Sequence, residues 1–452
     1  MTTDWTEVST AAGLLDGAGR EGARIEVHGV LSGMPMTRLA AGVHLRGGEL
    51  RFGAKGLQLT RDNVVEGVTV QSAEHEAAIL NDLTVESLGT VVLKDVVTVG
   101  QVLLLGDGRM RSGRVDVDGL RIQRADVRGR TSRPAGFGVE AMQGAFTLWN
   151  RHPDHRSRIA ATLLGISAGS ARAPVRGSGV FVAGLGADGG QLEVDVLRTE
   201  EIHADGGIAP GTPDLISGGV FVVMGARVGE VVNAGAVTTY GANDMVLDNW
   251  GRVGRWTALA PITSHGPSAI GVVNFWAIDE LRLGAVLETN GTGARGFNLY
   301  DGTLRRACFQ RITTKGDGAV GIQVAKQLSE IEIEHDLITE GGEGISLVKG
   351  VQTPLKAIAL SVLEGGHLGK VTIGGRLVTL GDDVVTLDVA GTLGELRVAG
   401  GIAALGKGSD AVRTNSDIGG LEAITIVAKD GHMIVPRAAS TTSEDCKLAR
   451  PR

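Results

Sequence analysis

Aromatic residues are scarce in this chain and make up only 3% of its 452 residues. Bulky rings would fit poorly into a thin core of stacked aliphatic side chains, so their scarcity favours a core of that kind. Cysteine is scarcer still, and two thiols, Cys308 and Cys446, cannot form a disulfide framework. Cys308 falls in a column of apolar residues, described below, and is therefore expected to be a small core residue.

Long runs of like charge and long runs of apolar residues are also missing. Lys and Arg number 44 against 51 Asp and Glu, a net charge of -7 with no long run of either sign, which argues against a nucleic-acid partner. The longest apolar run, Val96 to Leu105, is too short and too interrupted by polar residues to cross a bilayer, so we expect no membrane partner. Met1 to Val8 shows no basic segment followed by an apolar one, so we recognise no secretory signal peptide. The predicted location is cytoplasmic, with signal-independent export left open.

Glycine, in contrast, is abundant, with 70 residues, and through the centre of the chain it returns every 25 residues. Each of these glycines ends a Thr/Ser-x-Gly segment, which is typical of a turn between strands. We expect positive φ at these turns, because glycine tolerates it at no steric cost. The recurring residues are Gly241, Gly266, Gly291, Gly316 and Gly341.

Apolar residues keep fixed distances from these glycines and are spaced by two, as in short strands with one buried face. Arg295 is the one misfit in the column that lies four residues after the glycine. Three short strands in each 25 residues predict one coil of a right-handed parallel β-helix, so the expected fold class is all-β, a single solenoid. The column members include Met245, Ile270, Val320 and Ile345; Leu247, Val272, Phe297, Ile322 and Leu347; and Leu281, Leu283, Ile331 and Ile333.

The register survives interruptions, which indicates that it is structural. We interpret residues 208–216 and 350–364 as insertions at turns, after which the columns resume. The expected organisation is an N-terminal cap over 1–20, the β-helix over 21–430, and a C-terminal cap or tail over 431–452.

Two turn-strand units carry a resemblance to a known superfamily. Residues 313–322 and 379–387 are similar to the Thr-x-Gly-Asp-Asp-x-Ile segments of polygalacturonase-type members of the pectate-lyase-like superfamily. The resemblance implies a right-handed parallel β-helix and a carbohydrate partner. The Asn-Thr-Asp, Gly-His-Gly and Arg-Ile-Lys segments of the hydrolases in that group do not occur here in that form, and Gly366-His367 is the nearest approach.

Three acidic residues are candidates for catalysis on a sugar. Hydrolysis of a glycoside uses two carboxylates about 5 to 9.5 Å apart. Asp317, Asp382 and Asp383 each follow a turn glycine, and Asp382 and Asp383 form the best pair. The two turns are two coil steps apart, which places Asp317 roughly 10 Å or more from the pair. Capping of the turns is the alternative role for all three.

An aromatic stack is the second candidate site. Trp250, Phe275 and Tyr300 stand nine residues after three successive glycines, and Trp276 and Asp301 occupy adjacent positions. Consecutive coils would place the rings one above another as an exposed platform for a sugar or another flat ligand. The alternative is a ladder of rings that only seals the turn, since like residues in neighbouring coils pack well.

The third candidate is the densest polar cluster of the chain. His152, Asp154 and His155 are candidate metal ligands, and Arg151 and Arg156 could clamp a carboxylate or a phosphate. A structural metal site normally has four ligands, and no further ligand pair lies nearby in the sequence. A solvated surface loop is the alternative. No cofactor follows from the sequence.

Two classes of function remain open at this point. One is a carbohydrate-active enzyme, a lyase, hydrolase or epimerase, with a groove bounded by the inserted loops. The other is a non-catalytic binding, scaffold or spike-like assembly protein, for which a homo-oligomer is an expected form. The lack of a recognisable acid/base pair favours the second class, and the superfamily resemblance favours the first.

Overall fold

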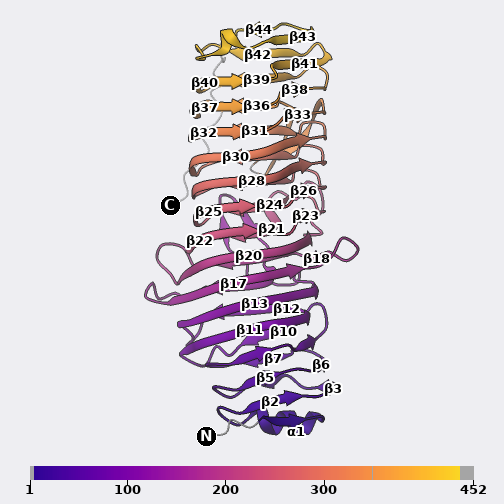
Figure 1. Ribbon diagram of the computed structural model, residues 1–452, viewed down its shortest axis with the longest axis vertical. Coiled ribbons are helices and arrows are strands. Elements are labelled where there is room, and N and C mark those ends of the chain that lie inside the picture. Colours follow the sequence, from indigo (N-terminus) through magenta and orange to yellow (C-terminus); the bar gives the residue numbers. More distant parts are fainter. Residues whose placement is uncertain (1–4, 349, 438–452) are drawn as a thin grey trace.

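The chain folds as a rod of stacked coils, a parallel β-helix, as the sequence predicts. The structure is a computed structural model that describes residues 5–348 and 350–437. Figure 1 shows the coils piled along one axis, from the N-terminal coils to the yellow C-terminal ones. Strands of successive coils pair in parallel, for example Met245 with Ile270 and Leu247 with Val272. Leu283 and Ile333 are 1% exposed and Ile322 is fully buried, which confirms the inward columns to which these three belong. The column of Met245 and Ile270 departs from the prediction, because these side chains pack in a separate cluster on the outer face of the strands.

The rod is built from two parallel sheets, which we call sheet A and sheet B. Sheet B supplies one strand of each coil. Its coil strands are β4 (Thr37–Arg38), β7 (Leu57–Leu59), β10 (Ala77–Asn81), β12 (Gln101–Gly106), β16 (Gly144–Asn150), β19 (Ser178–Ala183), β21 (Leu215–Val222), β24 (Asp244–Asn249), β27 (Ile270–Asn274), β29 (Arg295–Leu299), β31 (Val320–Val324), β36 (Leu360–Val362), β39 (Val385–Val389), β42 (Asp410–Thr414) and β44 (Ile434–Val435).

Sheet A supplies the other two faces of the rod. Several of its strands are long enough to bend from one face to the next, so that β28 pairs with both β25 and β26 of the preceding coil. Its strands are β1 (Thr6–Val8), β2 (Arg24–Val27), β3 (Val30–Met34), β5 (His44–Arg46), β6 (Glu49–Phe52), β8 (Val64–Glu66), β9 (Thr69–Gln71), β11 (Ser87–Val99), β13 (Ser112–Arg124), β17 (Arg158–Ala168), β18 (Val175–Arg176), β20 (Gln191–Asp205), β22 (Ala226–Asn233), β23 (Val237–Thr239), β25 (Arg252–Ala258), β26 (Ile262–Ser264), β28 (Ala277–Thr289), β30 (Thr303–Thr314), β32 (Gln327–Ile333), β33 (Leu337–Thr339), β37 (His367–Ile373), β38 (Leu377–Thr379), β40 (Thr392–Val398), β41 (Ile402–Lys407) and β43 (Ile426–Asp430).

Elements outside this regular stack are few. Helix α1 (Ala11–Ala18) covers the first coil, with the Thr10 side chain accepting a hydrogen bond from the backbone N–H of Gly13 and with Leu14 buried. A 3-10 turn, η1 (Leu421–Ala423), lies near the other end. Four further strands belong to inserted segments: β14 (Ala135–Gly136), β15 (Val139–Ala141), β34 (Glu343–Val348) and β35 (Val351–Lys356).

The recurring glycines are required for a reason different from the expected one. None of them has positive φ. Instead, a Cβ atom on Gly266, Gly291, Gly316 or Gly341 would collide with the carbonyl oxygen of the equivalent glycine one coil earlier. The column therefore selects glycine for close backbone approach between coils, and not for turn conformation.

Two further expectations about the register are wrong. Cys308 does not enter the core. Because the turn at Gly302 adds one residue to the coil, Phe309 takes the inward position between Leu283 and Ile333. Cys308 is half-buried and faces outward. Cys446 lies outside the described residues.

The second insertion also lies earlier than expected. It is the antiparallel hairpin β34–β35, spanning residues 343–356, and Ile322 pairs with Leu360 in the next coil. Ile345 and Leu347 therefore belong to the hairpin and not to the columns. The first insertion lies close to its expected place, as the segment 206–214 between β20 and β21.

Candidate functional site

Three segments from distant parts of the chain fold over one stretch of the outer face of sheet B. The first contains β15, which pairs with β21 through Ala141 and Ile216. The second is 206–214, where the Asn243 side-chain amide donates to the carbonyl of Thr212 at 2.9 Å. The third is the β34–β35 hairpin. Together they enclose outward-facing positions of β24, β27 and β29.

The hairpin is fastened to the turns that precede these strands. The Ser268 hydroxyl accepts a hydrogen bond from the backbone N–H of Leu347 at 2.9 Å, and the Ser346 hydroxyl donates to the carbonyl of Gly293 at 2.7 Å. Asn243 and Ser268 both have left-handed backbone conformations, with φ of 57° and 55°. The equivalent residue in the next coil is Gly293, which adopts a φ of 65° at no steric cost.

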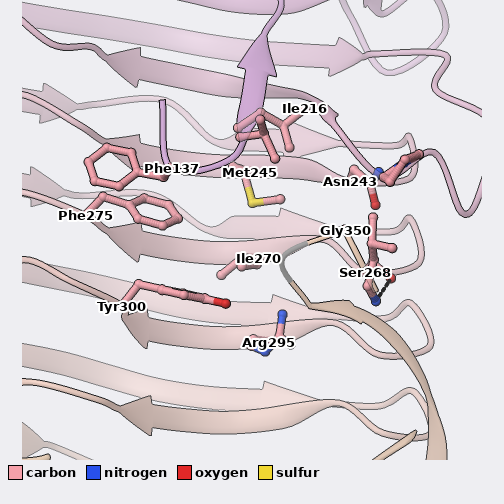
Figure 2. Close-up of a pocket in the computed structure, with 13 residues that line it drawn as sticks. Phe137, Ile216, Asn243, Met245, Ser268, Ile270, Phe275, Arg295, Tyr300 and Gly350 are labelled. Atoms are coloured by element: carbon pink, nitrogen blue, oxygen red, sulfur yellow. Dashed lines mark hydrogen bonds between the residues drawn. The ribbon is translucent and has the colours of Figure 1, made fainter. Parts of the chain in front are cut away.

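A cleft remains between the three segments and the sheet. It holds about 590 Å³ of space, part of which is open to solvent, and most of its wall is apolar. Figure 2 shows its wall from one side, with Ile216, Met245 and Ile270 between the aromatic rings and the turns that contain Asn243 and Ser268. The lining residues are Phe137, Val139, Pro213, Ile216, Asn243, Met245, Ser268, Ile270, Phe275, Arg295, Tyr300, Leu347 and Gly350.

The predicted aromatic stack forms one side of the cleft, but it is not an exposed platform. Phe275 and Tyr300 stack with ring centroids 5.1 Å apart, and Trp250 meets Phe275 edge-on at 6.2 Å. Phe137 stacks on Phe275 at 4.6 Å and covers Trp250, which is only 1% exposed. The stack therefore presents mainly ring edges to the cleft, and it is largely sealed at the Trp250 end.

Phe137 is a residue that the sequence analysis missed. It belongs to the Gly136-Phe137-Gly138 segment and has φ of 53°, a conformation that a bulky side chain rarely adopts. A phenylalanine between two glycines in a loop is the only sequence signal for it. Its ring separates the cleft from a second, more open hollow of about 830 Å³. We call this the Trp276 hollow, and its lining residues are Phe137, Gly186, Ala187, Gln191, Met224, Gly225, Ala226, Arg227, Trp250, Gly251, Arg252 and Trp276.

Arg295 is the charged group of the cleft. Its side chain replaces the apolar residues of its column, standing between Ile270 and Val320, and it is 2% exposed. Its Nε atom has no hydrogen-bond partner, and no described carboxylate forms an ion pair with it. Removal from water lowers the pKa of the guanidinium, which stays charged at neutral pH because arginine titrates so high. Burial likewise raises the pKa of the neighbouring Tyr300 hydroxyl.

Asp248 does not neutralise this charge, although it lies on the same outer face of the sheet. Its carboxyl is fully buried between Phe221 and Val273 of the adjacent strands. Burial raises the pKa of this carboxyl well above its ordinary value, and no ion pair joins it to Arg295 among the described residues. The positive charge of Arg295 is thus left without a counter-charge among the residues that the structure describes.

The candidate catalytic acids lie at turns outside the cleft. The Asp317 carboxylate accepts the backbone N–H of Gly342 at 2.8 Å, and that of Asp382 accepts the backbone N–H of Lys407 at 2.7 Å. Each of these side chains thus caps the equivalent turn of the following coil. Asp383 has φ of 54°, and its carbonyl accepts a hydrogen bond from the Lys356 ammonium at 2.6 Å. The structure does not bring Asp317 to the other two, because one whole coil separates them.

The polar loop is built from local contacts. The Asp154 carboxylate binds the Arg156 guanidinium at 2.9 Å, which lowers the pKa of that carboxyl, and the His152 ring accepts the backbone N–H of Asp154 at 3.0 Å. Arg151 reaches away to Asp107 at 2.6 Å. Over residues 5–348 and 350–437, no three His, Cys, Asp or Glu side chains are grouped as metal ligands would be. The candidate ligands His152, Asp154 and His155 therefore do not form such a group.

The remaining candidates, Trp276 and Asp301, lie outside the cleft. Trp276 is 56% exposed at the edge of the Trp276 hollow, whereas Asp301 forms an ion pair with Lys326 at 3.5 Å. Of the candidate site residues named from the sequence, Phe275 and Tyr300 line the cleft, and Trp250 and Trp276 line the hollow.

Comparison with family models, with curated proteins and with solved structures gives no significant match for this chain. In the part of the chain that the structure describes, no helix is long and apolar enough to span a membrane. The fold and the geometry of the cleft are therefore what a functional proposal can rest on.

Proposed function

We propose that this protein is a binding protein whose cleft holds a small, largely apolar ligand. The observation that carries the proposal is the convergence of three distant segments on one outer stretch of sheet B. Outward positions of a solenoid strand normally face water and are polar, yet Met245 and Ile270 are apolar and lie beneath these segments. The segments pack against the sheet at their edges and leave a hollow between them, as a concave apolar ligand site requires.

Binding is favoured over catalysis on a sugar by the position of the acids. Among the described residues no carboxylate lines the cleft, whereas glycoside hydrolysis uses two that face each other across the substrate. Asp317 and Asp382 are engaged in capping turns, which accounts for their sequence positions without a catalytic role.

Filling the cleft tests this function. Val139→Trp places a large ring at the partly exposed β15 wall, and Val351→Trp, on the outer strand of the hairpin where Val351 is 63% exposed, is the matched control. Small neutral molecules such as benzyl alcohol, cyclohexanol and 3-phenylpropanamide are titrated and followed by ligand-observed NMR. We expect saturable binding of at least one of them to wild type and to Val351→Trp, and its loss in Val139→Trp. Absence of saturable binding, or binding that survives in Val139→Trp, would show that the cleft is not the site.

A second candidate function is carbohydrate binding in the Trp276 hollow. A tryptophan ring that is 56% exposed beside Arg227 and Arg252 offers an apolar face and hydrogen-bond donors, the combination that binds sugar rings. Screening on a glycan array with wild type and Trp276→Ala tests it. Binding of a glycan by wild type that Trp276→Ala loses supports this candidate, and the absence of any bound glycan contradicts it.

A further inference from the structure

We propose that the ligand of the cleft carries a single carboxylate on an apolar body and that Arg295 binds the carboxylate. This inference rests on the proposed function, because it names the chemical class that the same cleft selects. It begins from the one residue that breaks the apolar column in the sequence. An arginine there needs a reason, since Ile270 and Val320 fill the equivalent places in the neighbouring coils with 4% and 2% of their surface exposed.

A buried arginine normally has an anionic partner. Taking a charge out of water is costly unless a counter-charge and hydrogen bonds replace the water. Arg295 is 2% exposed, and among the described residues its Nε atom has no hydrogen-bond partner and its guanidinium has no ion-pair partner. Its guanidinium lines the cleft, and Figure 2 shows the Tyr300 ring directed toward it along the wall. The missing partner therefore has to come from the cleft side.

The other polar groups of the wall are already engaged by the fold. The Asn243 amide donates to Thr212, and the Ser268 hydroxyl accepts from Leu347. Both groups are thus partly used in holding the inserted segments in place, and neither carries a charge. Arg295 is the charged group of the wall, and its Nε atom has no hydrogen-bond partner among the described residues.

The chemistry of the wall selects the kind of anion. One guanidinium forms a bidentate pair with a planar, singly charged carboxylate, whereas a dianionic phosphate would call for further cations or backbone donors. The remaining wall is mostly apolar, including Ile216, Met245 and Leu347, and the aromatic stack turns ring edges toward the space. Ring edges carry partial positive charge and tolerate an anion, while the apolar wall accommodates the hydrocarbon body.

Acid and amide pairs of the same shape provide the test. The probes are benzoate, 3-phenylpropanoate and octanoate, each compared with its primary amide by isothermal titration calorimetry at neutral pH. We expect at least one acid to bind wild type about tenfold or more tighter than its amide, because a charge-assisted hydrogen bond exceeds a neutral one by that margin. Arg295→Met should remove the preference by weakening the acid and not the amide. Arg295→Lys should retain part of it, since lysine keeps the charge without the fork.

Arg255→Met is the matched control. Arg255 is a half-exposed arginine on sheet A that pairs with Glu230 and Glu280, outside the cleft. It should leave all affinities unchanged, and circular dichroism checks that each variant keeps its β-sheet spectrum. Equal affinity for acid and amide, failure of every acid to bind at about 10 mM, or an acid preference that persists in Arg295→Met overturns the inference. If amides and acids bind equally and Val139→Trp abolishes both, the proposed function stands and only the carboxylate is wrong.

Discussion

Arg295→Met should make the protein more stable in the absence of ligand. The wild-type side chain carries a charge into a position that is 2% exposed, without a counter-charge among the described residues. Methionine keeps an unbranched chain of similar length, so it can fill the same space between Ile270 and Val320. The substitution therefore removes a desolvation penalty while retaining most of the packing.

The magnitude follows from the cost of burying a charge. The penalty for an ion is several kcal/mol after relaxation of the surroundings, and replacing buried charges by apolar groups of similar size stabilises by about 1 to 4 kcal/mol. At an unfolding entropy of about 2.1 cal/mol/K per residue, a chain of 452 residues gains only about 1 °C in melting temperature per kcal/mol. A shift of roughly 1 to 4 °C is therefore expected.

Local measurement is sharper than a melting curve, because a solenoid can open coil by coil. Hydrogen exchange followed by mass spectrometry should show slower exchange in β27, β29 and β31 of Arg295→Met, with the distant strands unchanged. Arg255→Met, whose guanidinium is largely in water, should show no such slowing. Faster exchange in these strands, or a melting temperature lowered by several degrees, would mean that Arg295 has a structural partner, and the argument for a ligand carboxylate would lose its basis.

Three other changes probe the fold and the wall of the cleft. The Asp244 carboxyl is fully buried, and burial raises its pKa from 3.8 to about 7. Because the folded state holds this proton more tightly than the unfolded state, the free energy of unfolding should fall as pH rises from about 4 to about 7. Denaturant titrations across this pH range should show that Asp244→Asn removes this part of the pH dependence. Ile333→Asp should cost several kcal/mol because it buries an unpaired charge, whereas the exposed Gln327→Asp on the same strand should cost little; equal urea midpoints would show that the inward face is misassigned. Trp250→Ala should cost about 3 to 5 kcal/mol, since the ring is 1% exposed beneath Phe137, and an unchanged unfolding midpoint would contradict that burial.

The fold could be predicted because its main signal is repetition. Leu283 and Ile333 recur at a fixed distance from glycines, and in a solenoid that distance is itself the geometry of the coil. Errors arose where one coil departs from the period. The extra residue at Gly302 moved Phe309 into the place expected for Cys308, and this shift is invisible to a strict count of 25.

The cleft could be predicted only in part. Phe275 and Tyr300 follow the 25-residue period and were predicted as site residues. Arg295 was recognised only as a charged residue in an apolar column, with no role assigned to it. Phe137 and Leu347 come from inserted segments, which have no period and whose path over the sheet depends on tertiary contacts such as the hydrogen bond from Leu347 to Ser268. Sequence patterns report the repeating scaffold, whereas a site assembled from its interruptions has to be seen in three dimensions.

The glycine column also determines how a chain of this kind can change its length. Because each of Gly266, Gly291, Gly316 and Gly341 fits against the carbonyl of its predecessor, a whole coil duplicated or deleted between two of them would restore this contact between glycines. A single residue added within a coil has to be absorbed before the next glycine, as happens between Phe309 and Arg311, which have one residue fewer between them than their partners Leu283 and Val286. The coil is thus the repeating structural unit of this protein. The cleft joins segments from several coils, so a coil added or removed between those segments would disrupt the cleft.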